Sequence, residues 1–269
     1  MCCTWFGIAG GINSRKNHIH DADYSKWLGP EWKSDLKEFR DSKKAGTYVS
    51  NHVGVVDIMM MHRVFYGGLG FVAADFLSKV ALLSKCISVS EGLFISREGS
   101  REERLSGVTN IVARQRELED KNCPRNPLLI FPEGFTSNNT TINKFRRGGF
   151  ESLCAVMPLV IKYHTPTVFP GNQTMLDHIP LVLHMCTLDI DRCEIICLPP
   201  FVPNEYLFSH PDYKHLPKWE AYAEAVRDVM CHYSGLGKSD VSLQTFKNYN
   251  QEMVGKKGQL SWNNKFKSD

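Results

Sequence analysis

Short strand-like runs and longer helix-like runs of apolar residues alternate along most of this chain. Residues of high strand propensity, bounded by turn-forming residues, predict strands at 46–50, 70–74, 93–96, 127–131 and 156–163. Between them, the apolar stretch 55–65 and the mixed stretch 76–85 favour helices. Two later runs, 181–189 and 193–198, predict a strand pair. Because strands that alternate with helices form a largely parallel sheet covered on both faces, the predicted fold class is α/β, a single domain with a largely parallel or mixed sheet flanked by helices.

Helix-boundary signals predict three further helices. Pro30 suits a first helical turn, which indicates a helix over 30–40. Ser100, followed three residues later by Glu103, has the pattern of a capping box, so a helix should run over 101–118. A late amphipathic segment predicts a helix over 218–233.

Composition and charge narrow the function classes only a little. The chain has 269 residues, 42% hydrophobic and 23% charged, which fits a globular protein with a full core. The formal net charge of +3 is too small to argue for nucleic acid and suits an anionic membrane surface or a phosphorylated ligand. The nine cysteines are odd in number and contain no Cys-x-x-Cys pair, so we expect reduced, cytosol-facing thiols and no metal site.

The first twelve residues, MCCTWFGIAGGI, are apolar but too short to span a membrane. No run of eighteen apolar residues follows them, so the sequence contains no clear transmembrane helix. The segment is open to several interpretations: an interfacial foot, the end of a lost membrane segment, a palmitoylated Cys2–Cys3 pair or a plain hydrophobic terminus.

The central chemical feature is a histidine with a carboxylate five residues later, His52 and Asp57. If His52 lies in the loop that leaves a strand and Asp57 in the first turn of the next helix, the carboxylate can reach the imidazole Nδ1. The Nε2 atom is then left to take a proton from an attacking hydroxyl. Gly54 permits the tight turn that this arrangement needs.

The same spacing occurs twice more, in His18 with Asp23 and in His184 with Asp189, so spacing alone nominates no site. The first pair has no strand before it, and the second lies in a strand pattern, where residues five apart point to opposite faces. Only His52 stands between a predicted strand and a predicted buried helix, which favours it as the functional histidine.

A second candidate segment, FPEGF at 131–135, follows a predicted strand at the sheet edge where open α/β sheets bind ligands. Glu133 could accept hydrogen bonds from a glycerol hydroxyl or buttress the histidine loop. A polar turn with a solvated carboxylate is the alternative.

Cationic residues supply the third feature. Arg97 ends the predicted strand 93–96 and suits a phosphate, because its planar fork binds phosphate oxygens bidentately, although a surface ion pair is the alternative. Lys144, Arg146 and Arg147 form a second cluster that could hold coenzyme A phosphates or lipid headgroups, or simply be solvated.

Taken together, these segments resemble the glycerolipid acyltransferase family of the 1-acylglycerol-3-phosphate acyltransferase type. That family has four ordered blocks: Asn-His-x4-Asp, Phe-Ile/Val-x-Arg, Phe-Pro-Glu-Gly and Val-x-Pro-Val. Here they read NHVGVVD at 51–57, FISR at 94–97, FPEGFTSN at 131–138 and VMPLVI at 156–161. FPEGFTSN followed by NKFRRGGF is most similar to the lysophosphatidylcholine/lysophospholipid acyltransferase branch, although Phe135 stands where the family usually has Thr.

The resemblance implies an acyl-CoA-dependent O-acyltransferase that moves a fatty acyl group to the free hydroxyl of a lysophospholipid, lysophosphatidylcholine or a related one. Backbone N–H groups near Gly54 or Gly134 are candidate donors to the reaction's oxyanion. The site residues that it implies are His52 as general base, Asp57 as its orienter, and a substrate-binding set of Arg97, Glu133, Gly134, Lys144 and Arg147.

The resemblance also divides the chain into a polar, membrane-proximal lead-in at 1–45, a catalytic domain at 46–200 and a C-terminal helical extension at 201–269. The implied partners are acyl-CoA as co-substrate, a lysophospholipid and a membrane surface, that of the endoplasmic reticulum. No prosthetic group, metal or nucleic acid is expected, and no oligomeric state is predicted.

Two alternatives stay open at this point. The first is a 1-acylglycerol-3-phosphate acyltransferase, which differs only in headgroup preference. The second is a catalytically silent membrane lipid-binding relative, against which the intact motif residues argue. A soluble serine hydrolase is disfavoured, because the sequence has no Gly-x-Ser-x-Gly elbow.

Overall fold

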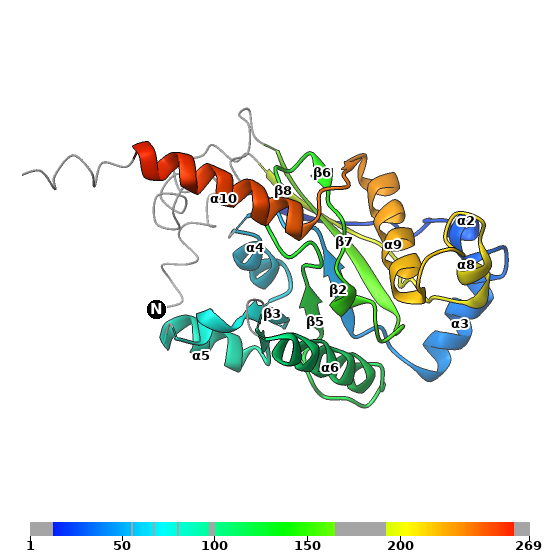
Figure 1. Ribbon diagram of the computed structural model, residues 1–269. Coiled ribbons are helices and arrows are strands. Elements are labelled where there is room, and N and C mark those ends of the chain that lie inside the picture. Colours follow the sequence, from blue (N-terminus) through cyan, green and yellow to red (C-terminus); the bar gives the residue numbers. More distant parts are fainter. Residues whose placement is uncertain are drawn as a thin grey trace, which may run out of the picture.

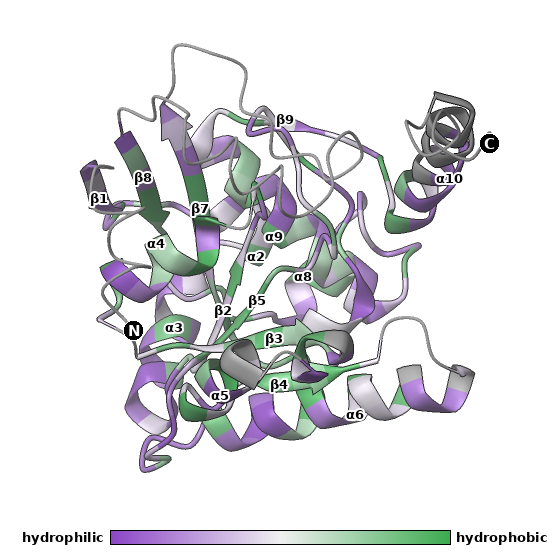
Figure 2. Cartoon of the chain, turned by 90° about the vertical axis from the view of Figure 1, so that its left-hand side faces the viewer, coloured by the Kyte–Doolittle hydropathy of each residue, from purple (hydrophilic) through white to green (hydrophobic). Residues whose placement is uncertain are grey.

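The computed structural model describes residues 13–54, 56–66, 68–79, 81–96, 100–164 and 192–260. Within these residues seven strands form one sheet in the order β1-β8-β7-β2-β5-β3-β4 (Figures 1 and 2). Neighbouring strands are parallel except for the antiparallel pair β7 and β8. The strands are β1 Asn13–His18, β2 Thr47–Ser50, β3 Gly70–Ala74, β4 Leu93–Ile95, β5 Leu128–Ile130, β7 Val156–His164 and β8 Arg192–Cys197. The prediction of a largely parallel or mixed sheet in one α/β domain is therefore confirmed.

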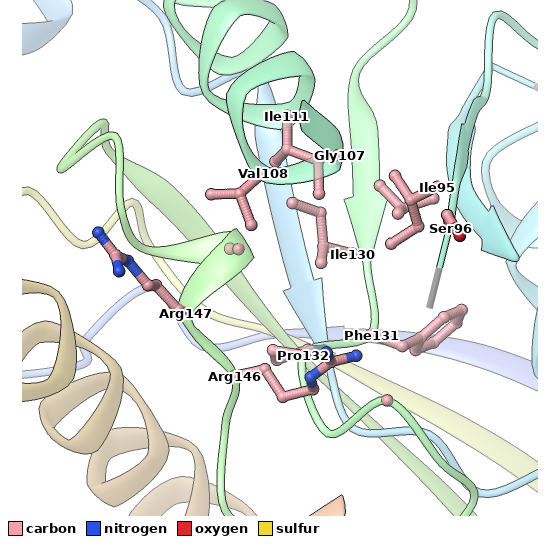
Figure 3. A pocket seen from close by; sticks show the side chains of 14 residues that line it. Ile95, Ser96, Gly107, Val108, Ile111, Ile130, Phe131, Pro132, Arg146 and Arg147 are labelled. Atoms are coloured by element: carbon pink, nitrogen blue, oxygen red, sulfur yellow. The ribbon is translucent and has the colours of Figure 1, made fainter. Parts of the chain in front are cut away.

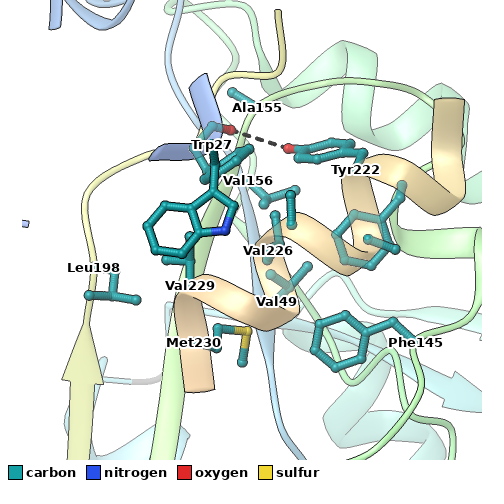
Figure 4. Packing of buried hydrophobic residues seen from close by; sticks show 14 of the residues in the cluster. Trp27, Val49, Phe145, Ala155, Val156, Leu198, Tyr222, Val226, Val229 and Met230 are labelled. Atoms are coloured by element: carbon teal, nitrogen blue, oxygen red, sulfur yellow. Dashed lines mark hydrogen bonds between the residues drawn. The ribbon is translucent and has the colours of Figure 1, made fainter. Parts of the chain in front are cut away.

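Helices cover both faces of this sheet (Figure 1). On one face α4 packs over a buried cluster that includes Met60, Leu129 and Ile161. On the other face α6 and α9 cover a larger cluster, and Val226, Val229 and Met230 of α9 pack there beside Val49 and Val156 (Figure 4). The helices are α2 Ser25–Leu28, α3 Trp32–Ser42, α4 Val56–Val64, α5 Ala81–Val89, α6 Arg101–Leu118, α8 Glu205–Ser209, α9 Lys218–Ser234 and α10 Leu243–Leu260, with 3-10 turns η1 Asp75–Lys79 and η2 Arg147–Gly149.

Hydropathy follows this layering. The strands β3 and β5 are mostly hydrophobic, whereas α6 presents hydrophilic positions on its outward side (Figure 2). A small second ladder, β6 Thr141–Ile142 with β9 Gly237–Lys238, ties the segment after the FPEGF motif to the end of α9. No helix within the described ranges is long and apolar enough to cross a membrane.

Most of the predicted elements are present. The capping box at Ser100 is formed, since its side chain accepts from the Glu103 amide while the Glu103 carboxylate accepts from the Ser100 amide. The helix predicted over 76–85 is instead η1 followed by α5, and the Ser78 hydroxyl bonds to the Asp75 carbonyl at 2.6 Å inside η1. Such side-chain-to-backbone bonds compete with regular helix and explain the interruption.

The edge of the sheet around β8 contains one strand that was predicted and one that was not. The segment 193–198 is a strand as predicted, but 181–189 lies outside the described residues. In the described part of the sheet β8 is paired with β7 on one side and with β1 on the other. The strand β1 was not predicted, because NSRKNH is polar throughout and has no apolar alternation to reveal it.

Candidate active site

His52 and Asp57 meet as the spacing argument requires. The strand β2 ends at Ser50, His52 lies in the loop that follows, and Asp57 is in the first turn of α4. The His52 Nδ1 and Asp57 Oδ2 atoms are 2.7 Å apart. The Asp57 side chain is fully buried, whereas that of His52 is 19% exposed. This leaves a partly accessible imidazole that a buried carboxylate orients, the geometry of a general base.

Four hydrogen-bond donors among the described residues hold Asp57. Its Oδ2 atom accepts from His52 Nδ1 and from the backbone amides of Val53, at 2.6 Å, and Gly54, at 3.0 Å. Its Oδ1 atom accepts from the Tyr163 hydroxyl at 2.8 Å. The carboxylate also lies at the amino end of α4, where the helix dipole favours a negative charge.

The Glu133 side chain is hydrogen-bonded to the backbone of the loop that carries His52. Its Oε1 atom accepts from the His52 amide at 2.9 Å, and its Oε2 atom accepts from the backbone and side-chain nitrogens of Asn143 at 2.9 and 2.6 Å. The Ser137 amide in turn donates to the His52 carbonyl at 2.6 Å. Burial raises the pKa of Glu133 to about 7, although these hydrogen bonds lower it. Glu133 was expected either to bind a glycerol hydroxyl or to support the histidine loop, and its contacts are those of the supporting role.

Two asparagine side chains extend the sheet where β2 stops. The Asn51 side chain bonds to both the amide and the carbonyl of Ile161, at 2.7 and 2.9 Å. The Asn139 side chain does the same for Tyr163, at 3.0 and 2.7 Å. Both carboxamides satisfy backbone groups of β7 that lie beyond the end of β2. The sheet therefore opens at this edge without losing hydrogen bonds, and the His52 loop occupies the opening.

A cavity of about 140 Å³ lies at the carboxyl ends of β4 and β5, one residue layer away from the histidine. Phe131 connects the two, because it lines the cavity and stacks on the His52 ring with centroids 4.2 Å apart. The walls are mainly apolar side chains and glycines of β4, β5, α6 and η2, and Arg146 supplies a cation beside Pro132 (Figure 3). A molecule in this cavity would contact Phe131, and through that ring it would be linked to the imidazole.

Gly134 is at a position that needs glycine. Its φ of +77° is in the left-handed region, and a Cβ there would lie 2.9 Å from the Arg146 Cδ atom. Its amide donates to the Phe131 carbonyl at 3.2 Å, and the Gly54 amide is bonded to Asp57. Both glycine amides considered as oxyanion donors are therefore engaged within the protein.

Two of the predicted substrate-binding cations, Lys144 and Arg147, are paired with carboxylates. Lys144 pairs with Glu220 at 3.0 Å, and Arg147 makes two 2.6 Å bonds to Glu151. Arg147 also borders the cavity, but its side chain points away from Pro132 (Figure 3). Arg97 lies outside the described residues, directly after the cavity-lining Ser96.

Of the two rival pairs, His18 and Asp23 lie among the described residues and form no comparable site. The prediction that no strand precedes this pair is wrong, because His18 is the last residue of β1, and its ring stacks on His20 with centroids 5.6 Å apart. Asp23 accepts hydrogen bonds from Ser25 and from the Trp32 indole. The pair His184 and Asp189 lies outside the described residues.

Four polar residues at the site were not predicted to serve it: Asn51, Asn139, Asn143 and Tyr163. Asn51 stands within the NHVGVVD block, so its position was a signal that could have been used. Tyr163 is 106 residues from Asp57, and no local pattern links the two.

The chain is similar in sequence to several named acyltransferases. The chain is 26% identical over 218 residues to a lysophospholipid acyltransferase, LPEAT1, of Arabidopsis thaliana, covering 80% of this chain and 51% of that protein. It is 30% identical over 200 residues to a lysophosphatidylcholine acyltransferase of Drosophila melanogaster, covering 73% and 34%. It is also 30% identical over 164 residues to glycerol-3-phosphate acyltransferase 3 of Xenopus laevis, covering 59% and 34%. The chain thus spans about half or less of the length of these relatives.

Among solved structures, the 1-acyl-sn-glycerophosphate acyltransferase PlsC of Thermotoga maritima aligns with a TM-score of 0.47 at 13% identity, covering 86% of this chain and 80% of that one. The family model named Acyltransferase matches residues 33–170, a range that contains the His52–Asp57 pair, the FPEGF segment and Tyr163. With its model matched over more than half of the sequence, the chain belongs to the acyltransferase family.

Proposed function

We propose that this protein is an acyl-CoA-dependent O-acyltransferase that transfers a fatty acyl group to the free hydroxyl of a lysophospholipid. The observation that carries the proposal is the 2.7 Å contact between His52 Nδ1 and the buried Asp57, beside a cavity whose Phe131 wall stacks on the imidazole. The names of the Arabidopsis and Drosophila relatives support a lysophospholipid as the acceptor.

In the proposed reaction His52 acts as general base. Its Nε2 atom takes the proton of the acceptor hydroxyl as the hydroxyl oxygen attacks the thioester carbonyl carbon. The new C–O bond gives a tetrahedral oxyanion, which collapses with cleavage of the C–S bond and expels the coenzyme A thiolate. The imidazolium then returns its proton to that thiolate. Asp57 keeps the proton on Nδ1 and stabilises the imidazolium while it exists.

The substrates would be placed by the surrounding groups. Glu133 fixes the His52 backbone, and Gly134 leaves room for Arg146 beside the cavity. In this scheme Arg146 and Arg97 attract the acceptor's phosphate, since a guanidinium binds phosphate oxygens bidentately. Lys144, outside the cavity, and Arg147, at its border, are proposed to contact the phosphates of the substrates, which requires both side chains to exchange their carboxylate partners. Because a lysophospholipid resides in a bilayer, the proposed place of action is a membrane surface, that of the endoplasmic reticulum.

A second acceptor class is favoured by two observations. One relative of comparable identity is named glycerol-3-phosphate acyltransferase 3, and a cavity of about 140 Å³ with an arginine at its wall has the size and charge for a small phosphorylated glycerol. 1-Acylglycerol-3-phosphate carries the same phosphorylated glycerol and is the third acceptor to compare. A silent lipid-binding role is disfavoured, because such a role has no need of the assembled His52–Asp57 pair.

The test is release of coenzyme A from oleoyl-CoA with lysophosphatidylcholine, lysophosphatidylethanolamine, 1-acylglycerol-3-phosphate or glycerol 3-phosphate as acceptor. We expect turnover with a lysophospholipid and a loss of about 100-fold or more in His52→Ala, because a general base contributes that much. The matched control is His18→Ala. His18, like His52, is followed five residues later by an aspartate, and the variant should keep wild-type turnover.

Each outcome decides between the hypotheses. A preference for glycerol 3-phosphate or 1-acylglycerol-3-phosphate would replace the acceptor class and leave the reaction standing. If no acceptor supports turnover in a folded protein that still binds liposomes, the catalytic proposal is wrong and the silent lipid-binding alternative stands.

A further inference from the structure

Tyr163 is a buried residue on β7 whose hydroxyl contacts the site's carboxylate and not the cavity. Its side chain is on the same sheet face as Leu159 and Ile161, where α4 packs. Asp57 is fully buried and Tyr163 is 3% exposed, so this contact is shielded from bulk solvent. Among the described residues, Tyr163 is the donor to Asp57 Oδ1, whereas the other three donors all bond to Oδ2.

The division of donors between the two oxygens has a consequence for geometry. The three groups at Oδ2 belong to the consecutive residues 52–54, in the loop that must hold the imidazole. Rotation about the Asp57 Cβ–Cγ bond moves both oxygens, and the three donors at Oδ2 all belong to one short loop that could shift with the carboxylate. A donor on Oδ1, anchored in a different element, restrains that rotation independently.

Tyr163 is itself anchored. Its amide and carbonyl are bonded by the Asn139 side chain, and its neighbours in β7 are paired with β8. Asn139 belongs to the segment that follows the FPEGF motif, and its φ is +65°. The hydroxyl therefore has a fixed origin in the sheet, tied to the same loop whose Glu133 and Ser137 hold the His52 backbone.

The Tyr163 hydroxyl keeps its proton at neutral pH. Burial, and next the charge of Asp57, raise the pKa of Tyr163 well above its usual range. The phenol is therefore available as a hydrogen-bond donor to Asp57 at neutral pH. Leaving Oδ1 buried without a donor would cost free energy, because an unsatisfied charged group in the interior is expensive.

We propose that Tyr163 is a positioning residue for the acyl transfer, fixing Asp57 from the side opposite the imidazole so that Oδ2 stays aligned with His52 Nδ1. The inference rests on the proposed function of His52 as general base. The alternative is that Tyr163 serves only to fill space with its ring. In that case Tyr163→Phe, which keeps the ring and removes the hydroxyl, would leave the orientation of Asp57 unchanged.

The experiment compares Tyr163→Phe with Tyr222→Phe. Tyr222 is the matched control, because it is also fully buried and its hydroxyl also makes hydrogen bonds, to the carbonyls of Cys154 and Phe201. We expect kcat to fall about tenfold or more in Tyr163→Phe with both KM values within about twofold of wild type, since the alignment of the base and not substrate binding is changed. Tyr222→Phe should lose comparable stability and keep wild-type kcat.

A second readout does not need turnover. The downfield proton resonance of the His52 Nδ1–H group, assigned by its absence in His52→Ala, reports the bond to Asp57 directly. It should shift or broaden in Tyr163→Phe and stay unchanged in Tyr222→Phe. In the Asp57→Asn background, Tyr163→Phe should change kcat less than about twofold, because residues that act through one partner are not additive.

These outcomes separate the two proposals. If the wild type is inactive, the proposed function fails, but the resonance still tests the positioning role. The positioning role is wrong if Tyr163→Phe changes neither the resonance nor kcat. It is also wrong if Tyr222→Phe loses as much kcat as Tyr163→Phe does. If Tyr163→Phe does not fold, 3-fluorotyrosine at position 163 keeps the hydroxyl and alters its donor strength, and the same resonance must then move.

Discussion

At the scale of single residues, the site contains two buried carboxyl groups, Asp57 and Glu133, that contact different parts of His52. Asp57 is bonded to the imidazole, whereas Glu133 is bonded to the backbone that carries it. Glu133 has no exposed surface, and it joins the loops of residues 52 and 143. The histidine therefore depends on a second acidic group that it does not touch with its ring.

The raised pKa of Glu133 leads to a prediction for stability. In the folded state burial raises its pKa to about 7, above the ordinary glutamate value of 4.5, so the folded protein holds this proton more tightly than the unfolded chain. Its contribution to stability is present below pH 4.5 and is lost as the pH rises through 7. Relative to Glu133→Gln, the wild-type free energy of unfolding should fall by up to about 3 kcal/mol over that window.

Urea titrations of both proteins at several pH values measure this difference. The Gln variant is expected to be less stable overall, because its amide group meets the Asn143 donors, so the informative quantity is the change with pH. Curves that run parallel from pH 4.5 to 7 would show that Glu133 stays ionised in the folded protein.

What the sequence could predict at this scale depended on local context. His52 and Asp57 stand together between a strand and a helix, so their contact follows from short-range structure. The function of Tyr163 and Asn139 depends on β7 lying beside the end of β2, which is a tertiary fact. No pattern within either segment carries that information.

At the scale of elements, the boundaries that had a chemical signal were predicted best. The capping box fixed the start of α6, and the strand β5 ends at Ile130, two residues before Pro132. The helix α10 had no such signal and was expected only as part of a helical extension. Its first turn packs on the motif loop, with Phe246 stacked on Phe135 at 4.4 Å. Phe135, where the family usually has Thr, thus has a partner that explains an aromatic residue there.

The cap of α6 gives the prediction at this scale. Ser100→Ala removes the acceptor for the Glu103 amide and should lower the free energy of unfolding by about 1 kcal/mol. The matched control is Ser106→Ala, an exposed serine in the interior of the same helix, where alanine should be neutral or slightly stabilising. Chemical denaturation of the three proteins measures both values. Equal stability of the two variants would mean that the cap contributes nothing measurable.

At the scale of the whole molecule, one core joins segments from both ends of the chain. Phe201 has ring contacts with Tyr24 at 5.3 Å and with Tyr222 at 5.8 Å. The first of these partners lies in the lead-in 1–45 and the second in the extension 201–269, whereas Val49 and Val156 of the same cluster belong to 46–200. We therefore expect the three segments to unfold together.

Phe201→Ala tests this expectation. Removing a fully buried ring should lower the free energy of unfolding by about 3 to 5 kcal/mol, and Phe208→Ala, at a half-buried ring, should cost less. Tryptophan fluorescence and far-UV circular dichroism should report one shared transition in wild type and variant. Two separate transitions would indicate that the lead-in or the extension unfolds by itself.

The pairing of β1 with β8 has a consequence for how the protein is made. Asn13 pairs with Arg192, so the strand nearest the amino end waits for a partner 179 residues further along the chain. At ribosomal rates of about 5 to 20 residues per second, that wait lasts about 10 to 35 s. An apolar strand left open for so long would invite aggregation, but NSRKNH carries two cationic side chains and no large apolar one. The polarity that hid β1 from a hydrophobic pattern is what keeps it hydrated until synthesis reaches its partner.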